Sequence, residues 1–163
     1  MSKKALVIID IQNDITKNYK EIIDKINSAV DMASEKDIPV VYIKHNNLSA
    51  GTRTFKPGTR GEELVPELKV VSENIFVKSK ASALTSEEFA DFISQNEISH
   101  FYLAGADATA CVKSTSFNLR KENFDVTILS DCITSYDKRK IPEMLAYYES
   151  KGCEIIELKD LKF

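Results

Sequence analysis

Patterns typical of buried strands and of amphipathic helices alternate along the whole chain. Short runs rich in Val, Ile, Leu and Phe predict six strands, at residues 5–10, 39–45, 75–78, 100–104, 125–130 and 154–158. Apolar side chains three or four positions apart predict helices between them, at residues 19–36, 85–96, 111–122 and 138–151. Gly152 fits the position just after the last helix, where a left-handed residue often ends a helix.

The predicted strands contain few polar residues, which is typical of a parallel sheet with helices on both faces. A chain of 163 residues is long enough for one domain. We therefore expect a single three-layer α/β/α domain spanning residues 1–163, with a six-stranded, mainly parallel sheet in the order 3-2-1-4-5-6. Thr85, three residues before Glu88, suggests a capping box at the start of one helix.

Composition excludes several classes of function. With 22 Lys and Arg against 25 Asp and Glu, the net charge is −3, so we expect no nucleic-acid partner. The apolar runs are far shorter than the roughly 20 residues of a membrane span, and the N-terminus does not fit a secretory signal. We therefore expect a cytoplasmic protein with no membrane partner.

The cysteines and histidines also narrow the chemistry. Cys111, Cys132 and Cys153 are odd in number and widely spaced, which argues against a disulfide framework. The two histidines, His45 and His100, do not form a zinc-binding cluster with these cysteines in the sequence. The glycine-rich motifs of nucleotide-binding proteins are absent. We therefore predict no cofactor and no metal.

Three reactive side chains stand where strands end, which is where ligands bind in such sheets. Asp10 ends the first strand, Lys78 ends the third, and Cys111 lies in the first turn of the helix after the fourth. Free N–H groups at a helix N-terminus favour a thiolate and could hold an oxyanion. Each residue alone also fits a structural role. Together they suggest a cysteine nucleophile with an acid and an ammonium group beside it.

Four segments, in order along the chain, resemble a known family. Residues 10–14 (DIQND) are similar to its D-x-Q-x-D motif, and residues 78–84 (KSKASAL) to its K-x-x-x-S-A-F motif. Residues 105–115 (GADATACVKST) resemble G-x-x-T-[DE]-x-C-V-x-x-T, and residues 131–135 (DCITS) resemble D-A-x-x-S. The chain thus resembles the isochorismatase-like superfamily of cysteine hydrolases, which includes nicotinamidases and N-carbamoylsarcosine amidohydrolases.

The resemblance implies that Asp10, Lys78 and Cys111 form a catalytic triad. It implies a cis peptide bond between Ala106 and Asp107, and an oxyanion hole made by the backbone N–H groups of Asp107 and Cys111. Family members that act on isochorismate typically lack the cysteine. Cys111 therefore favours hydrolysis of an amide or carbamoyl/ureido C–N bond of a small molecule, through a thioester acyl-enzyme. The resemblance also implies a homo-oligomer, either a dimer or a tetramer.

Several positions depart from the family pattern. Ala108 replaces the usual Thr and Thr109 the usual acidic residue, so a hydrogen bond that supports the turn is lost or relocated. Leu84 replaces the usual Phe. Metal-binding nicotinamidases carry D-x-H and further histidines near the second strand, where this chain offers only His45. The resemblance therefore carries over neither a metal nor a preference for nicotinamide.

Residues just after the strand ends could line a small substrate pocket. These candidates are Ile15, His45, Leu48, Phe55, Leu84 and Tyr136. Lys78 must also cross an offset of about 10 Å to reach Asp10, because strand three lies two places from strand one. The altered turn leaves a non-catalytic binding or scaffold protein as an alternative hypothesis. A redox-sensing thiol is a third hypothesis, if Cys132 lies close to Cys111 in space.

Overall fold

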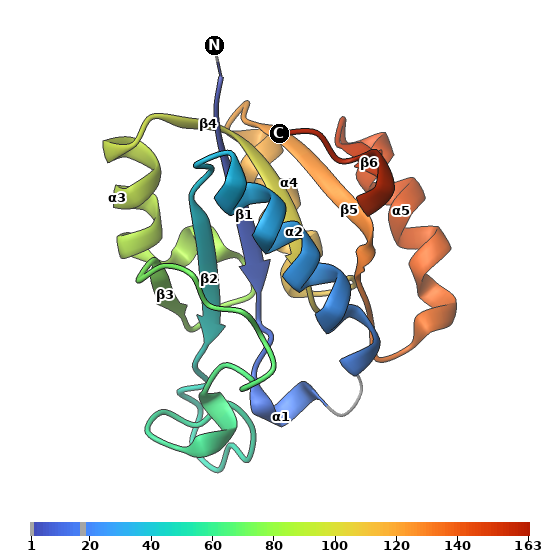
Figure 1. The fold of residues 1–163 in the computed structure, drawn as a ribbon. Helices are drawn as coiled ribbons and strands as arrows, with labels where there is room; N and C mark the ends of the chain where they lie inside the picture. Colours follow the sequence, from blue (N-terminus) through green and yellow to red (C-terminus); the bar gives the residue numbers. More distant parts are fainter. Residues whose placement is uncertain (1, 17–18) are drawn as a thin grey trace.

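A computed structural model describes residues 2–16 and 19–163 of the chain (Figure 1). The strands are β1 (Lys3–Ile9), β2 (Val40–His45), β3 (Ile75–Lys78), β4 (Ile98–Gly105), β5 (Asp125–Ile133) and β6 (Glu154–Ile156). The α-helices in these ranges are α1 (Asn13–Thr16), α2 (Ile23–Glu35), α3 (Glu87–Gln95), α4 (Cys111–Lys121) and α5 (Ile141–Ser150). None of these helices is both long and apolar enough to cross a membrane.

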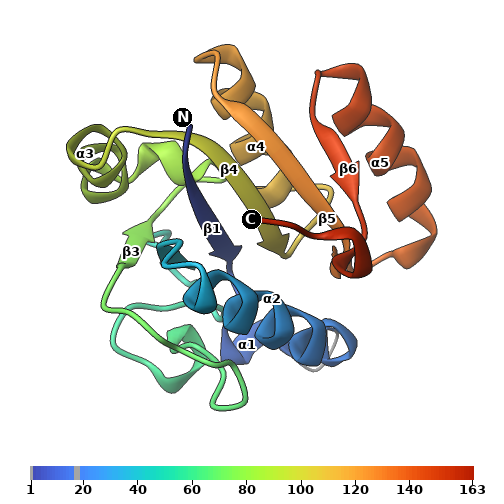
Figure 2. The ribbon, with the colours of Figure 1, turned by 45° about the horizontal axis from the view of Figure 1, so that its top comes forward.

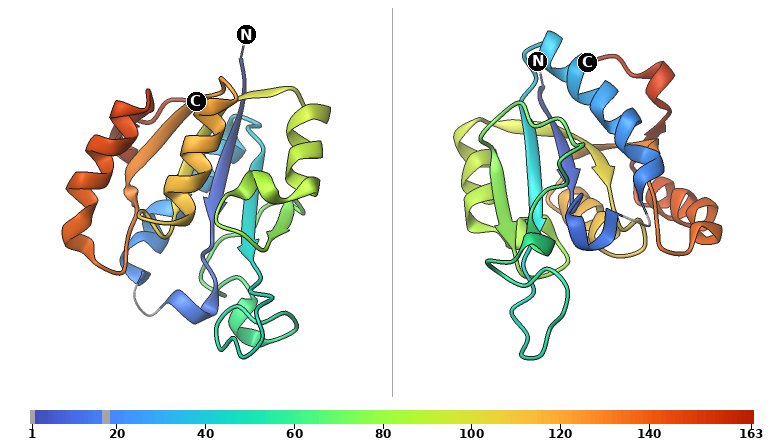
Figure 3. Two further views of the ribbon diagram at one scale, coloured as in Figure 1. Left: turned by 180° about the vertical axis from the view of Figure 1, so that it is seen from behind. Right: turned by 60° about the horizontal axis from the view of Figure 1, so that its bottom comes forward.

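The strands form a six-stranded sheet in the order β3-β2-β1-β4-β5-β6. Every neighbouring pair is parallel, which confirms the predicted sheet and its strand order. Helix α2 covers one face of the sheet, and α3, α4 and α5 cover the other (Figures 2 and 3). The three-layer α/β/α architecture predicted from the alternating patterns is therefore confirmed.

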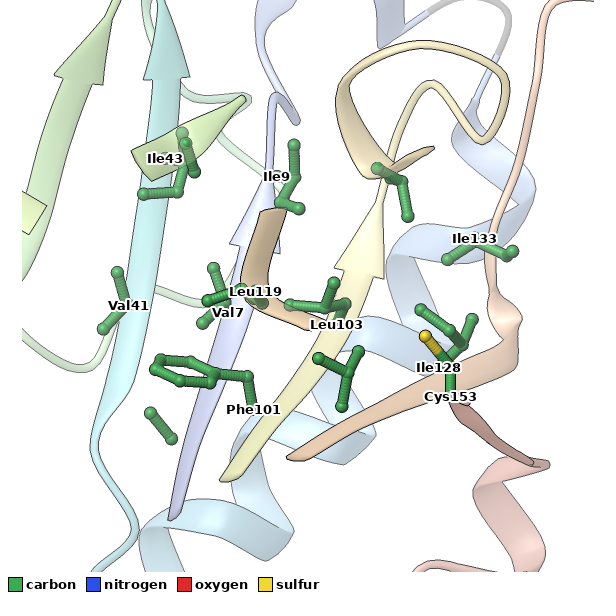
Figure 4. Packing of buried hydrophobic residues seen from close by; sticks show 14 of the residues in the cluster. Val7, Ile9, Val41, Ile43, Phe101, Leu103, Leu119, Ile128, Ile133 and Cys153 are labelled. Carbon is green, nitrogen blue, oxygen red and sulfur yellow. The ribbon is translucent and has the colours of Figure 1, made fainter. Parts of the chain in front are cut away.

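The four inner strands β1, β2, β4 and β5 bury side chains on both faces, which explains why their sequences are almost continuously apolar. In β1, Val7 and Ile9 pack into the core beneath α3, α4 and α5, whereas Leu6 and Ile8 pack into the core beneath α2. Figure 4 shows the first of these cores, where Val7 and Leu103 lie beside Leu119 of α4. These two cores hold the strand ends, and so the residues that follow them, in fixed positions.

Several element boundaries differ from the predictions. The helix expected from residue 19 begins as a short 3₁₀ turn, Lys20–Ile22, before α2. The predicted cap at Thr85 is wrong, because Thr85 ends another 3₁₀ turn and the Ser86 hydroxyl accepts the capping hydrogen bond from the N–H of Phe89. Helix α1 has four residues, too few to leave a periodic signal in the sequence. Gly152 follows α5 at a φ of +87°, as expected.

The loops at the carboxyl edge of the sheet are tied together by the D-x-Q-x-D segment. Buried Gln12 donates to the carbonyl oxygens of His45 (2.9 Å) and Glu62 (2.7 Å), and it accepts a hydrogen bond from the N–H of His45 (2.9 Å). Asp14 accepts a hydrogen bond from the N–H of Phe55 (2.7 Å). These bonds fix the end of β2, and the long loop that follows it, next to Asp10; that loop lies at the bottom of Figure 1.

Candidate active site

The three reactive residues that the sequence singled out meet at one point. The Lys78 Nζ atom lies 3.2 Å from Asp10 Oδ2 and 3.3 Å from Cys111 Sγ. Asp10 and Lys78 are each only 2% exposed, whereas Cys111 is partly exposed. An acid after β1, an amine at the end of β3 and a thiol at the start of α4 therefore form one cluster at the carboxyl edge of the sheet.

The end of β2 explains how Lys78 spans the distance to Asp10. Lys78 pairs in register with His45, the last residue of β2. Its side chain passes this strand end, and Nζ lies 2.9 Å from Nδ1 of His45. An ammonium group has three protons to donate, and here it has three partners: Asp10, His45 and Cys111. The sequence placed His45 in the pocket but did not reveal this contact.

Because Lys78 donates to Nδ1, His45 is the neutral tautomer with its proton on Nε2. Burial and the positive charge of Lys78 lower the pKa of His45 to about 4. His45 therefore remains uncharged at neutral pH and adds no second positive charge to the cluster. Its ring also contacts Phe55 edge-on, with the ring centroids 5.7 Å apart.

Asp10 has an unusual environment for a buried carboxylate. Its backbone adopts a φ of 56°, in the left-handed region, which turns the chain sharply out of β1. Oδ2 accepts from Lys78, but no hydrogen-bond partner reaches the buried Oδ1 atom from the part of the chain that the structure describes. Burial raises the pKa of Asp10, although Lys78 and Cys111 oppose this effect. The free oxygen is available to take a proton from a neighbouring group.

The expected stabilisation of a Cys111 thiolate is contradicted. Burial, followed by the negative charge of Asp10, raises the pKa of Cys111 to about 12, although Lys78 lowers it. The resting sulfur is therefore a thiol at neutral pH, and an acceptor must remove its proton before it can act as a nucleophile.

The turn from Gly105 to Cys111 leaves two amide groups free. Five of the seven N–H groups from Ala106 to Val112 donate to protein acceptors, namely those of Ala106, Ala108, Thr109, Ala110 and Val112. The N–H groups of Asp107 and Cys111 have no acceptor within residues 2–16 and 19–163. They are the two groups that the family resemblance implies for an oxyanion hole. The peptide bond between Ala106 and Asp107 is cis, as the resemblance also implied.

Gly105 permits this turn to lie against the end of β1. Its φ is +117°, and a Cβ atom at this position would lie 2.2 Å from the carbonyl oxygen of Ile9. A side chain would therefore force the ends of β1 and β4 apart. Because Asp10 directly follows Ile9, the distance between the acid and the thiol depends on this glycine.

The side chain of Asp107 was not predicted to have a role. Its carboxylate accepts hydrogen bonds from Tyr19, Thr109, Ser135 and Tyr136. These bonds tie the turn before Cys111 to Tyr19 and to the loop after β5. Two sequence features could have indicated this role: Asp107 lies four residues before Cys111, and Ser135 is the last residue of the segment 131–135.

The cluster also has a donor set that could hold a metal ion. Single ligand atoms of Asp10, His45 and Cys111 lie within 4.8 Å of one another. However, the Lys78 ammonium lies within 3.3 Å of all three residues and already supplies a positive charge there. A metal ion would have to displace a buried, charged lysine, so these residues do not fit a metal in this arrangement.

The other candidate pocket residues are spread more widely. Leu48 and Tyr136 are 71% and 79% exposed, and Ile15 packs against the core beneath α2. Leu84 packs against the other core and lines a groove beside α3 that contains none of the three clustered residues. Of the proposed pocket, the structure brings His45, with Phe55 against it, to the cluster.

Cys111 and Cys132 lie on opposite faces of the sheet. Cys132 is fully buried in the core beneath α2, whereas Cys111 packs against the opposite core. Cys153 is buried in that opposite core, beside β6. The hypothesis of a redox pair with Cys132 therefore has no support from this arrangement.

Comparisons with known proteins agree with this fold. The curated isochorismatase family protein YaaI of Bacillus subtilis is 25% identical over 151 residues, covering 83% of each chain. N-carbamoylsarcosine amidase from Thermoplasma acidophilum superimposes with a TM-score of 0.87 at 18% identity, covering 99% of both chains. Nicotinamidase PncA from Bacillus subtilis gives a TM-score of 0.86 at 22% identity, covering 95% of this chain and 100% of that one.

The sequence model of the isochorismatase domain matches residues 4–160, which is nearly the whole chain. The matched range contains all three clustered residues and the turn with the two free N–H groups. The chain therefore belongs to the isochorismatase family.

Proposed function

We propose that the protein hydrolyses an amide or carbamoyl/ureido C–N bond of a small molecule, with Cys111 as the nucleophile. One observation carries this proposal: Lys78 contacts both Asp10 and Cys111, and two unpaired backbone N–H groups lie in the turn that ends at this sulfur. The family membership and the two amidases among its structural neighbours support the same type of reaction.

The first step is the transfer of the thiol proton from Cys111 to Asp10. The free Oδ1 atom is the acceptor, and its raised pKa makes it a stronger base than an exposed carboxylate. Lys78 stabilises the resulting thiolate through the contact at 3.3 Å. Because the pKa of Cys111 is about 12, the thiolate forms only transiently, when Asp10 takes its proton.

The thiolate then adds to the carbonyl carbon and places negative charge on the carbonyl oxygen. The N–H groups of Asp107 and Cys111 donate hydrogen bonds to that oxygen. One such donor is worth about 3–4 kcal/mol in comparable acyl transfers. Since neither group has another acceptor among the described residues, neither must break a hydrogen bond to do so.

Collapse of the tetrahedral intermediate breaks the C–N bond. Protonated Asp10 gives its proton to the nitrogen, so ammonia or an amine leaves, and the acyl group remains on the sulfur as a thioester. Asp10 is then ionised again and accepts a proton from a water molecule that attacks the thioester. The C–S bond then breaks, the carboxylic or carbamic acid product leaves, and Asp10 returns its proton to the sulfur, which restores the thiol and the carboxylate.

The proposal is tested by measuring ammonia release from a panel of small primary amides, carbamoyl amines and ureido acids. We expect turnover of at least one class, and loss of that turnover in Cys111→Ala. Cys132→Ala is the matched control, because Cys132 is buried in the other core. Full activity of Cys111→Ala towards the best substrate would disprove the mechanism.

The alternative is a non-catalytic scaffold, favoured only by the changed residues Ala108 and Thr109. Labelling with iodoacetamide separates the two hypotheses. Burial raises the pKa of Cys132 to about 12 and that of Cys153 to about 11, so pKa does not set Cys111 apart. Cys111 differs from the other two cysteines in being partly exposed and in contacting Lys78. If the protein is an enzyme, iodoacetamide should therefore label Cys111 first. Equal labelling of all three would favour the scaffold.

We also propose that the chain acts as one domain in the cytoplasm and forms a homo-oligomer. The exposed apolar residues on and before the edge strand β3 support an assembly surface. These residues are Val70, Val71, Ile75 and Val77. Analytical ultracentrifugation should give a dimer or a tetramer, whereas a monomer at micromolar concentration would contradict this proposal.

A further inference from the structure

The carboxylate of Asp107 is saturated with hydrogen bonds. Its Oδ1 atom accepts from the N–H of Thr109 (2.8 Å), the hydroxyl of Thr109 (2.9 Å) and the hydroxyl of Ser135 (2.8 Å). Its Oδ2 atom accepts from the hydroxyl of Tyr19 (2.9 Å) and the N–H of Tyr136 (3.0 Å). Five donors fill the acceptor positions of one carboxylate, so this group is poorly placed to bind a substrate as well.

The five donors come from three separate segments. Tyr19 precedes α2, Thr109 lies in the turn itself, and Ser135 and Tyr136 lie in the loop after β5. Burial alone would raise the pKa of Asp107, but the hydrogen bonds from Thr109, Tyr136 and Ser135 lower it below its ordinary value. The carboxylate is therefore ionised at neutral pH, and its charge strengthens each of these bonds.

The main chain around Asp107 is held just as firmly. The Ala108 N–H donates to the carbonyl oxygen of Thr134 (2.9 Å), and the Asp107 carbonyl oxygen accepts from Ala110 and Val112. The hydroxyl of Tyr148 donates to the carbonyl oxygen of Ala108. Within this network the N–H of Asp107 itself has no acceptor in the described part of the chain.

We propose that the Asp107 carboxylate is a positioning group, which fixes the direction of its own backbone N–H so that it can serve as an oxyanion donor. It replaces the threonine and the acidic residue that the family pattern has at positions 108 and 109. The inference rests on the proposed function, because an oxyanion forms only if Cys111 attacks a carbonyl group. Asp107 thereby acts through its amide, and its side chain touches no reacting atom.

Two reactions of the same sulfur separate positioning from a general structural role. Acylation of Cys111 by p-nitrophenyl acetate develops charge on a carbonyl oxygen, whereas alkylation by iodoacetamide displaces iodide at a saturated carbon and develops none. Loss of oxyanion stabilisation therefore slows the first reaction and spares the second. Asp107→Asn is the main variant. Its amide oxygen can replace Oδ1, but its NH₂ group takes the place of Oδ2 and cannot accept the hydrogen bond from the N–H of Tyr136.

We expect Asp107→Asn to slow acylation about tenfold and Asp107→Ala about a hundredfold. Alkylation of Cys111 should stay within about twofold of wild type. The matched control is Asp137→Asn in the same loop, because the Asp137 side chain is paired only with Arg139 among the described residues; both of its rates should be unchanged. Should Asp107→Ala fail to fold, the double variant Tyr19→Phe/Ser135→Ala removes two donors and should slow acylation several-fold.

The outcomes are distinct. Equal acylation rates in wild type and Asp107→Asn would overturn the inference and leave the proposed function intact. A parallel fall in acylation and alkylation would also overturn it, because that result marks a merely structural role. If wild-type Cys111 is alkylated but not acylated, the proposed function fails and the inference fails with it.

Discussion

Asp10 and Asp107 follow strand ends at the same edge of the sheet, but their surroundings are opposite. Asp10 is buried, its pKa is raised, and one of its oxygens has no partner among the described residues. Asp107 is half-buried, its pKa is lowered, and it accepts five hydrogen bonds. A carboxylate that must exchange a proton keeps an oxygen free, whereas a carboxylate that holds a turn in place uses all of its acceptor positions.

The largest effect on the rate of hydrolysis should follow from replacing the Asp10 carboxylate, whose free oxygen is the proposed base. Asp10→Asn should lower the rate of amide hydrolysis about a thousandfold, because the amide neither accepts the thiol proton nor protonates the leaving amine. Alkylation of Cys111 should not slow, since Asp10 raises the pKa of this thiol. The measurements are ammonia release and iodoacetamide labelling.

Asp31→Asn is the control for this prediction, because Asp31 lies on α2 in a half-exposed pair with Lys69 and has no contact with the clustered residues among those described. It should leave both rates unchanged. Hydrolysis by Asp10→Asn within tenfold of wild type would mean that another group takes the proton.

The next effect concerns stability. Lys78→Met leaves the Asp10 carboxylate buried without its charge partner, so the free energy of unfolding at pH 7 should fall by about 4 kcal/mol. Lys69→Met, which breaks the half-exposed pair with Asp31, should cost less than about 1 kcal/mol. Urea denaturation measures both values. A similar loss for the two variants would show that Lys78 does not compensate a buried charge.

Gly105 lies against Ile9, which precedes Asp10, and comes two residues before Asp107. A side chain at this position should therefore displace the backbone at both aspartates. Gly105→Ala should lower the free energy of unfolding by about 3 kcal/mol, because the new methyl group collides with the carbonyl oxygen of Ile9 at a positive φ. Gly58→Ala is the matched control: its φ is +80°, but no atom lies within 4 Å of the added Cβ. We expect a loss of about 1 kcal/mol there, by thermal or urea unfolding. Equal losses would argue against close contact between β1 and β4.

The last prediction concerns how the rate of hydrolysis depends on pH. Because the pKa of Asp10 is raised, hydrolysis should decline as pH falls through a value above its ordinary 3.8, where Asp10 gains a proton and no longer acts as a base. Asp107, with its lowered pKa, stays ionised over the same range. We expect about a tenfold fall in kcat/KM for each pH unit below the Asp10 pKa.

His45 also titrates near this range, with a pKa of about 4, and it contacts Lys78 directly. The pH profile of His45→Gln therefore serves as the control. If the decline arises from Asp10, it should persist in this variant. Its disappearance would assign the decline to His45.

The fold was predictable because each strand is a nearly continuous apolar run and each longer helix carries a clear period. The order of strands is the common order of such α/β sheets. The cluster of Asp10, Lys78 and Cys111 followed from where the apolar runs end and from the family motifs. Helix α1 and the cap at Ser86 were missed, because four residues show no period and two neighbouring hydroxyl residues compete for one cap.

The electrostatics of the site could not be predicted from residue order. The sequence placed Cys111 at a helix N-terminus but did not reveal how deeply the sulfur is buried or how close Asp10 lies, and both raise its pKa. The contact between His45 and Lys78 depends on the register of β2 and β3. The hydrogen bonds of Asp107 depend on three segments that meet only in the folded chain.

A crystal structure of the protein with the aldehyde analogue of its best amide substrate would test the central claim most directly. We predict that Cys111 Sγ adds to the aldehyde carbon as a thiohemiacetal, with the oxygen within hydrogen-bond distance of the N–H groups of Asp107 and Cys111. An unmodified sulfur at saturating aldehyde, or an oxygen directed away from both N–H groups, would contradict it.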